Sequence, residues 1–111
     1  MPSHFTSAAE LRGKEIAKGV MMKPLPGRNV MLSYVELAPG SEVPTHSHPH
    51  EQGGMVVEGQ FEMWIGDERK VLSKGDMYMI AGGTPHGGRP VNGRAIVLDV
   101  FHPLREEYLT P

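Results

Sequence analysis

The residues with the clearest potential for chemistry lie between His46 and Gln52, in the sequence HSHPHEQ. His46 and His48 are two positions apart, and side chains two positions apart on a β-strand project from the same face. Neutral imidazole is the commonest protein ligand for transition metals, and a partly open site of three or four nitrogen and oxygen donors is a catalytic geometry. A further histidine, His86, lies well downstream. The pattern therefore predicts a metal site.

The elements that must position these histidines are predicted to be short strands. From Val30 onward, short apolar segments alternate with turn signals such as Ala38-Pro39-Gly40. Strands this short, at intervals near ten residues, are typical of an antiparallel sandwich or barrel. The expected strands are Val30–Leu37, Met55–Val57, Phe61–Ile65, Lys70–Leu72, Met77–Ile80 and Ala95–Phe101.

A single all-β domain over residues 1–111 is the expected organisation. A chain of 111 residues is long enough to bury a core, and it contains no internal repeat, low-complexity tract or linker. Ser7–Lys18 alone carries a helical pattern, which Gly13 interrupts, and it predicts a short helix. The eight methionines are expected to fill irregular gaps in the core, among them Met21, Met22, Met55, Met63, Met77 and Met79.

Composition excludes several classes of partner. The formal charge of −2 comes from scattered residues of both signs, so no basic stripe predicts nucleic-acid binding. No apolar run approaches the length of a membrane span, and Met1 to Thr6 lack the apolar region of a signal peptide. The chain has no cysteine, so a metal must be held by nitrogen and oxygen donors. A cytoplasmic location is the default expectation.

One carboxylate stands out on the last predicted strand. If Ala95–Phe101 is a strand, Asp99 shares a face with Val97 and Phe101. A carboxylate among apolar neighbours is costly unless a partner or a function accounts for it. Arg105 follows shortly after, and its planar guanidinium can hold a carboxylate through two parallel hydrogen bonds. Two alternatives stay open: Asp99 as a structural hydrogen-bonding residue, and Arg105 as a surface partner of Glu106 or Glu107.

Two sequence motifs resemble those of the cupin superfamily, which consists of small jelly-roll barrels with a metal in the barrel mouth. In the first motif, glycine precedes His-x-His by five residues, and a carboxylate and a second glycine follow. In the second, glycine is followed by Pro-x-Gly and a histidine. Here Gln52 replaces the usual glutamate and Ala81 the usual proline. The matching residues are Gly40, His46, His48, Gln52 and Gly59 in the first motif, and Gly75, Ala81, Gly83 and His86 in the second.

A finer resemblance concerns cupins of the KdgF type, which open the ring of 4,5-unsaturated uronates released from pectin or alginate and give linear 4-deoxy-5-keto-uronates. It rests on the HSHPHEQ stretch and on Asp99, Phe101 and Arg105. The resemblance implies that Asp99, Phe101 and Arg105 line the substrate side. It also implies that His46, His48, Gln52 and His86 bind one divalent transition metal, which donor type alone leaves open among Ni, Zn, Fe, Mn and Co.

The resemblance further implies a small carboxylated sugar as the substrate and a homodimer as the assembly. Gln52 is either a direct ligand or a hydrogen-bond partner of a water, because an amide is a weak ligand. Two rival functions stay open. One is another metal-dependent cupin enzyme, a dioxygenase or a polyketide cyclase, and the other is a non-catalytic sugar-binding cupin.

Overall fold

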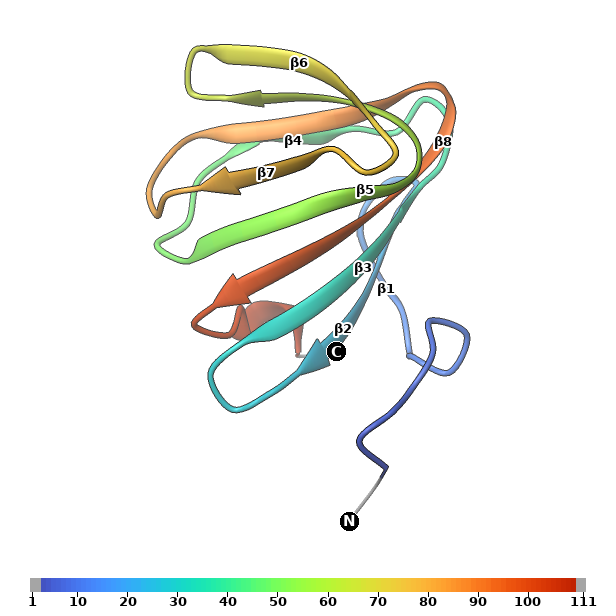
Figure 1. The fold of residues 1–111 in the computed structure, drawn as a ribbon, viewed down its shortest axis with the longest axis vertical. Coiled ribbons are helices and arrows are strands. Elements are labelled where there is room, and N and C mark those ends of the chain that lie inside the picture. The colour runs from blue at the N-terminus through green and yellow to red at the C-terminus, as the bar shows by residue number, and fades with distance from the viewer. Residues whose placement is uncertain (1–2, 110–111) are drawn as a thin grey trace.

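The computed structural model describes residues 3–109, and strands dominate them (Figure 1). No helix among these residues is both long and apolar enough to cross a bilayer. A single 3-10 turn, η1, follows the last strand at Glu106–Tyr108. The strands are β1 (Lys14–Ala17), β2 (Val20–Pro26), β3 (Met31–Leu37), β4 (Val43–His46), β5 (Glu51–Ile65), β6 (Glu68–Ser73), β7 (Met77–Ile80) and β8 (His86–His102).

Two long strands close the sheet into a jelly-roll barrel. The sheet order is β1-β2-β3-β8-β5-β6, with β4 added to β8 and β7 added to β5, and every pairing is antiparallel. The first part of β8 pairs with β4 and with the end of β5, whereas its last part pairs with β3 and with the start of β5. The same two strands therefore run through both layers of the barrel, which confirms the predicted fold class.

Alternating side chains on β3 and β8 build the interior. On β3, Ser33 and Val35 are buried, while Tyr34 between them is partly exposed. The last part of β8 follows the predicted alternation, since Val97, Asp99 and Phe101 all point inward and are buried. The apolar core comprises Val20, Met22, Val35, Leu37, Val56, Phe61, Met63, Leu72, Tyr78, Ile80, Ala95 and Val97.

The helix predicted over Ser7–Lys18 is wrong. Residues near Ser7 form only hydrogen-bonded turns, and Lys14–Ala17 is strand β1, which pairs with β2. Gly19, with φ of +79°, lies in the connection between the two strands. Helical propensity is a weak preference, and here pairing with a neighbouring strand overrides it.

Two predicted strands are pieces of one longer strand. Met55–Val57 and Phe61–Ile65 belong to the single strand β5, in which the register with β8 shifts around Gly59. Gly59 has φ of +78°, and a Cβ there would overlap the backbone carbonyl of Arg94, so the irregularity requires glycine. The sequence pattern predicts that a strand ends at Glu58-Gly59, whereas in the structure the strand β5 continues through Gly59 with a shift in register.

The prediction that methionines fill the core is correct only in part. Met22 and Met63 are buried, but Met77 and Met79 on β7 are 73% and 69% exposed and Met55 on β5 is 37% exposed. These three side chains lie on the outer surface of the sheet, because the inner positions of β7 are taken by Tyr78 and Ile80. With Val100 of β8, they form what we call the methionine face.

Candidate metal centre and active site

Three histidines converge at one end of the barrel. His46 is the last residue of β4 and His86 the first of β8, and the two are direct partners in the β4–β8 pairing. His48 lies in the connection to β5 and is buried. One ring nitrogen from each histidine lies within 4.8 Å of those of the other two. Antiparallel pairing therefore brings together two candidate ligands that are forty positions apart in the chain.

Backbone carbonyls orient all three rings. A carbonyl oxygen only accepts hydrogen bonds, so the contacts of His46 and His86 require the proton on Nδ1 and leave the lone pair of Nε2 for a cation. His48 has a carbonyl oxygen at each ring nitrogen, and its neutral ring can donate to only one of them. The carbonyl of Pro44 lies 2.8 Å from Nδ1 of His46, that of Thr84 lies 2.8 Å from Nδ1 of His86, and that of His50 lies 3.2 Å from Nδ1 of His48.

The free ring nitrogens fit a divalent transition cation. Nε2 of His86 is buried and has no hydrogen-bond partner among the described residues. Nε2 of His48 lies 3.0 Å from Oε1 of Gln52, and with the His48 proton on Nδ1 these two atoms present lone pairs to each other. Burial, reinforced by the charge of Arg105, lowers the pKa of His48 to about 4, and burial lowers the pKa of His86. Both rings are therefore neutral at physiological pH, as metal ligation requires.

Gln52 connects the histidines to the buried carboxylate. It is the second residue of β5 and is buried, with its carbonyl oxygen at His48. Its side chain also lies beside Asp99 and favours the ionised form of that carboxylate. Because the Gln52 oxygen is at His48, the amide nitrogen is the polar atom left for the carboxylate.

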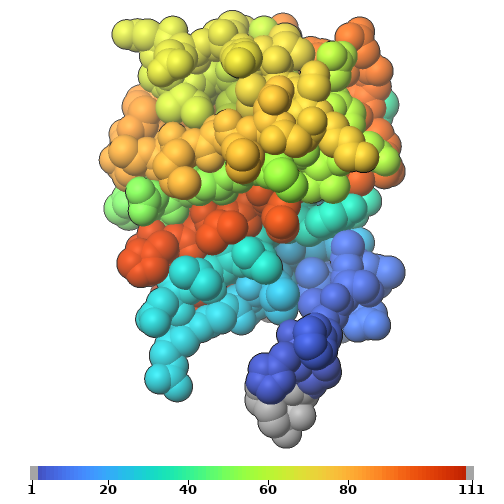
Figure 2. Space-filling view, viewed as in Figure 1, coloured from blue at the N-terminus to red at the C-terminus, as the bar shows by residue number. Residues whose placement is uncertain are grey.

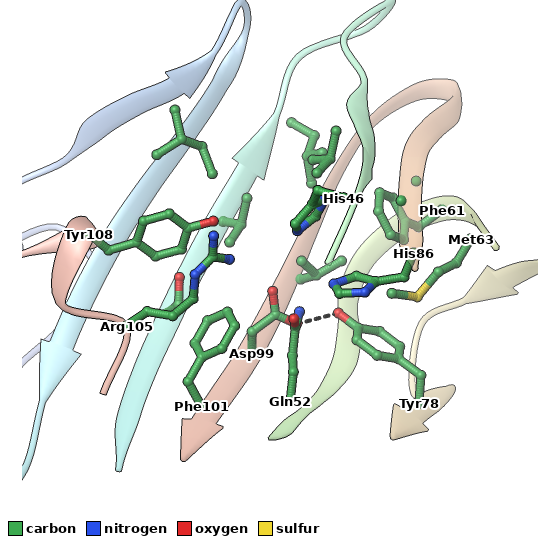
Figure 3. Close-up of a pocket in the computed structure, with 18 residues that line it drawn as sticks. His46, Gln52, Phe61, Met63, Tyr78, His86, Asp99, Phe101, Arg105 and Tyr108 are labelled. Atoms are coloured by element: carbon green, nitrogen blue, oxygen red, sulfur yellow. Dashed lines mark hydrogen bonds between the residues drawn. The ribbon is translucent and has the colours of Figure 1, made fainter. Parts of the chain in front are cut away.

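Asp99 lies at the centre of the cavity, on β8. The Tyr78 hydroxyl donates a hydrogen bond of 2.5 Å to Oδ1 of Asp99 (Figure 3). Burial raises the pKa of Asp99 to about 6, although the hydrogen bond from Tyr78 and the neighbouring Gln52 side chain oppose that shift. Burial likewise raises the pKa of the Tyr78 phenol, so the phenol keeps its proton and acts as the donor. No sequence motif marks Tyr78, so it is absent from the predicted site residues.

Arg105 lies between two aromatic rings at the wall of the cavity. Its guanidinium carbon is 4.0 Å from the ring centre of Tyr108 and 5.3 Å from that of Phe101. Its Nε also donates to Glu107 at 2.7 Å, as the surface-pair alternative anticipated, yet the Arg105 side chain is only 11% exposed. The backbone carbonyl of Leu104 contacts the His50 ring at 3.1 Å. His50 therefore ties the segment that carries Arg105 to the connection between β4 and β5.

These groups surround one cavity of about 50 Å³ (Figure 3). All of the predicted site residues except His48 line it. His48 lies behind this wall, where it contacts Gln52 and the Phe101 ring, whose centre is 5.7 Å from that of His48. The structure adds Tyr78 and Tyr108 to the set. The polar residues of the cavity wall are Ser33, His46, Gln52, Tyr78, His86, Asp99, Arg105 and Tyr108.

A jelly-roll barrel with a histidine triad in its mouth defines a class of protein, and comparison with known families identifies the same class. The model of the cupin domain family matches residues 33–101, which include both histidine motifs and Asp99. The chain belongs to the cupin family.

Among curated relatives, the pectin degradation protein KdgF of Dickeya dadantii (strain 3937) is 30% identical over 98 residues, which cover 86% of this chain and 89% of that protein. The structure of KdgF from a Halomonas species superposes with a TM-score of 0.87 at 28% identity, covering 96% of this chain and 98% of the other. An RmlC-like cupin from Shewanella frigidimarina gives a TM-score of 0.88 at 28% identity, covering 96% of both chains.

Proposed function

We propose that this protein is a metal-dependent enzyme that opens the ring of 4,5-unsaturated uronates from pectin or alginate breakdown. The products are linear 4-deoxy-5-keto-uronates. The observation that carries the proposal is that Asp99, Arg105 and two histidines, His46 and His86, line one cavity, and that His48 completes a histidine triad with those two. The similarity to KdgF supports it.

The donor set determines what a bound cation would contribute. His46, His48 and His86 would hold it, with Gln52 as the fourth donor, directly or through a water. When bound, the cation supplies Lewis acidity that polarises the sugar oxygens. Gln52 brings no charge, whereas a glutamate would neutralise part of the cation, so the site keeps more of that acidity.

Arg105 is the proposed binding residue for the substrate carboxylate. Its Nε is engaged by Glu107, while its terminal nitrogens remain to form hydrogen bonds with an anionic ligand. The neighbouring rings of Phe101 and Tyr108 limit the positions that its guanidinium can take. We propose that Phe101, which is buried beside the His48 ring, packs against the sugar.

Asp99 is the proposed group that moves the proton. The carboxylate removes the proton from the anomeric hydroxyl, the bond between C1 and the ring oxygen breaks, and its electrons pass to that oxygen as an enolate. A proton then adds to C4, which gives the aldehyde at C1 and the ketone at C5. The proton taken is balanced by the proton returned, so the reaction is an isomerisation. A positioned acid or base contributes on the order of 10²–10⁴ in rate.

Substrate binding requires the C-terminal segment to move. The cavity of about 50 Å³ is smaller than the roughly 300 Å³ at the low end of small-molecule sites. Arg105 and Tyr108 form one of its walls, and the segment around them is held by side-chain contacts from His50 and Lys14. An outward shift of this wall enlarges the cavity while the barrel stays intact.

The direct test is incubation of the metal-loaded protein with an unsaturated galacturonate released by a pectin lyase. We expect the ultraviolet absorbance of the conjugated enoate to disappear faster than in the spontaneous reaction, and a chelator to abolish the acceleration. Asp99→Asn should lower the rate about 100-fold or more with its metal content unchanged.

An absorbance decay that is the same with and without protein would refute the proposal. Oxygen consumption, or turnover of an aromatic polyketide in place of the uronate, would favour the rival cupin enzymes. Tight binding of the uronate without turnover would favour the sugar-binding module. A full rate in Asp99→Asn would remove Asp99 from the proton transfer while leaving the reaction in place.

We propose further that the protein acts as a homodimer that pairs through the methionine face. Met77 pairs with Met55 across β7 and β5, and Val100 lies on the neighbouring strand β8. Figure 2 shows these strands side by side on one face, β7 in gold, β5 in green and the last part of β8 in red. Monomeric proteins rarely expose contiguous apolar surface of this kind, and methionine is frequent at adaptable interfaces.

Light scattering coupled to size exclusion tests this assembly. We expect the mass of two chains at micromolar concentration, and the mass of one chain after the double substitution Met77→Glu and Met79→Glu. Val71→Glu is the matched control, because Val71 is 46% exposed on the neighbouring strand β6. A wild-type protein with the mass of one chain would contradict the proposed dimer.

A further inference from the structure

Asp99, Gly54 and Tyr78 form a row across three neighbouring strands. Gly54 of β5 pairs with Asp99 of β8 on one side and with Tyr78 of β7 on the other. Asp99 and Tyr78 are 7% and 9% exposed, and both line the cavity. Directly opposed residues on adjacent strands share a face of the sheet. Tyr78 and Asp99 thus face the barrel interior from strands that do not pair with each other.

The hydrogen bond between them depends on the absent side chain of Gly54. A Cβ at this position would overlap both Oδ1 of Asp99 and the Tyr78 ring. Gly54 does not have a positive φ, so space and not backbone conformation requires glycine here. The Tyr78 ring crosses over Gly54 and reaches the carboxylate one strand further on, where the O–O distance is 2.5 Å.

The position of the hydroxyl defines how the carboxylate can turn. Tyr78 donates to Oδ1 of the carboxylate, and the Gln52 side chain lies beside it. In Figure 3, the other oxygen of Asp99 lies away from the Tyr78 hydroxyl, on the side of Arg105. The donor at Oδ1 therefore limits how the carboxylate can turn, and the second oxygen is left for a ligand in the cavity.

We infer that Tyr78 is a positioning residue for Asp99. Its ring crosses the space above Gly54, and its hydroxyl holds the Asp99 carboxylate in the orientation that meets the anomeric hydroxyl of the substrate. The inference rests on the proposed ring-opening function and adds to it a residue of β7. Because Tyr78 acts through Asp99, its loss affects turnover more than substrate binding. A misplacement of about 1 Å in a catalytic group costs on the order of 100-fold in rate.

Steady-state kinetics of the metal-loaded Tyr78→Phe variant on the unsaturated galacturonate test this role. The change removes only the hydroxyl and keeps the ring that covers Gly54. We expect kcat to fall about 10- to 100-fold, with KM within about twofold of the wild-type value. Tyr34→Phe is the matched control, since Tyr34 lies on the outer face of β3 and its variant should keep wild-type kcat.

A double-mutant cycle separates positioning from a general structural role. In the Asp99→Asn background, Tyr78→Phe should cause no further loss of kcat, because the group on which it acts has been changed. Equal kcat in wild type and Tyr78→Phe, a rise in KM with kcat unchanged, or fully additive losses would each overturn the inference while leaving the ring-opening function in place. A wild-type protein that does not turn over the uronate overturns both.

Discussion

Asp99 shows at the scale of one residue how a barrel interior prepares a carboxylate for proton transfer. Burial favours its neutral form, while the hydrogen bond from Tyr78, the neighbouring Gln52 side chain and the charge of Arg105 favour the ionised form. The effect of burial on the Asp99 pKa exceeds the opposing effects, and the resulting pKa of about 6 lies close to physiological pH. A carboxyl group with such a pKa can both accept and return a proton, as the proposed isomerisation requires.

The pKa of Asp99 predicts how the rate depends on pH. Asp99 must be ionised to take the anomeric proton, so kcat should fall as pH decreases through about 6, by up to tenfold per pH unit below it. The measurement is kcat from pH 4.5 to 8, with metal content determined at each pH. With the pKa of His48 held near 4, that ligand stays neutral through most of the range. A constant kcat down to pH 5 would contradict the assigned base.

At the scale of one strand, β5 contains two adjacent glycines, Gly53 and Gly54, with different surroundings. Gly53 points outward, where a Cβ would meet the end of the exposed Met79 side chain at 3.1 Å. Gly54 points inward, where a Cβ would overlap Asp99 and the Tyr78 ring. A flexible exposed side chain can move aside, whereas a buried ring and carboxylate held by a hydrogen bond cannot do so without loss.

The two glycines therefore predict a large difference between neighbouring substitutions. Gly54→Ala should lower the free energy of unfolding by about 1–3 kcal/mol through overpacking. Gly53→Ala should change it by less than about 0.5 kcal/mol, as is usual for surface positions. Urea denaturation of the two variants measures both values. Equal stabilities would show that the space above Gly54 is not the constraint that the structure indicates.

At the scale of the whole molecule, barrel closure assembles the candidate metal centre. His46 and His48 come from the β4 side, His86 from the start of β8, and Gln52 from the start of β5. These segments meet only because β5 and β8 run through both layers. The unfolded chain holds no such arrangement, so a cation bound by these residues stabilises the folded state.

Metal binding should therefore raise the unfolding temperature. Saturation to about 100 times Kd contributes about 2.7 kcal/mol, which corresponds to an increase of roughly 10 °C for a domain of this size. Differential scanning calorimetry with and without Ni²⁺, Zn²⁺ or Mn²⁺ measures the shift. His86→Ala should abolish it, and His102→Ala, at an exposed position on β8, should retain it. An equal shift in both variants would place the cation elsewhere.

Local patterns in the chain predicted the parts of the fold that depend on periodicity. Met31–Leu37 and Met77–Ile80 lie within one residue of their predicted bounds, because alternation and flanking turn residues are local signals. The continuity of β5 through Gly59 and the strand β1 could not be predicted in this way, since both depend on pairing with distant segments. The roles assigned to Asp99, Phe101 and Arg105, and a cytoplasmic location, stay predictions.

By itself, the sequence determined the identity and spacing of the donors: HSHPHEQ, a downstream histidine, and a carboxylate placed by alternation on an inward face. Only the tertiary structure decided that Tyr78 reaches Asp99, and that Met55, Met77 and Met79 face outward. The physical reason is that periodicity assigns a side chain to a face, but strand register decides which faces meet. Whether a face is core or surface depends on the layer that the barrel places against it.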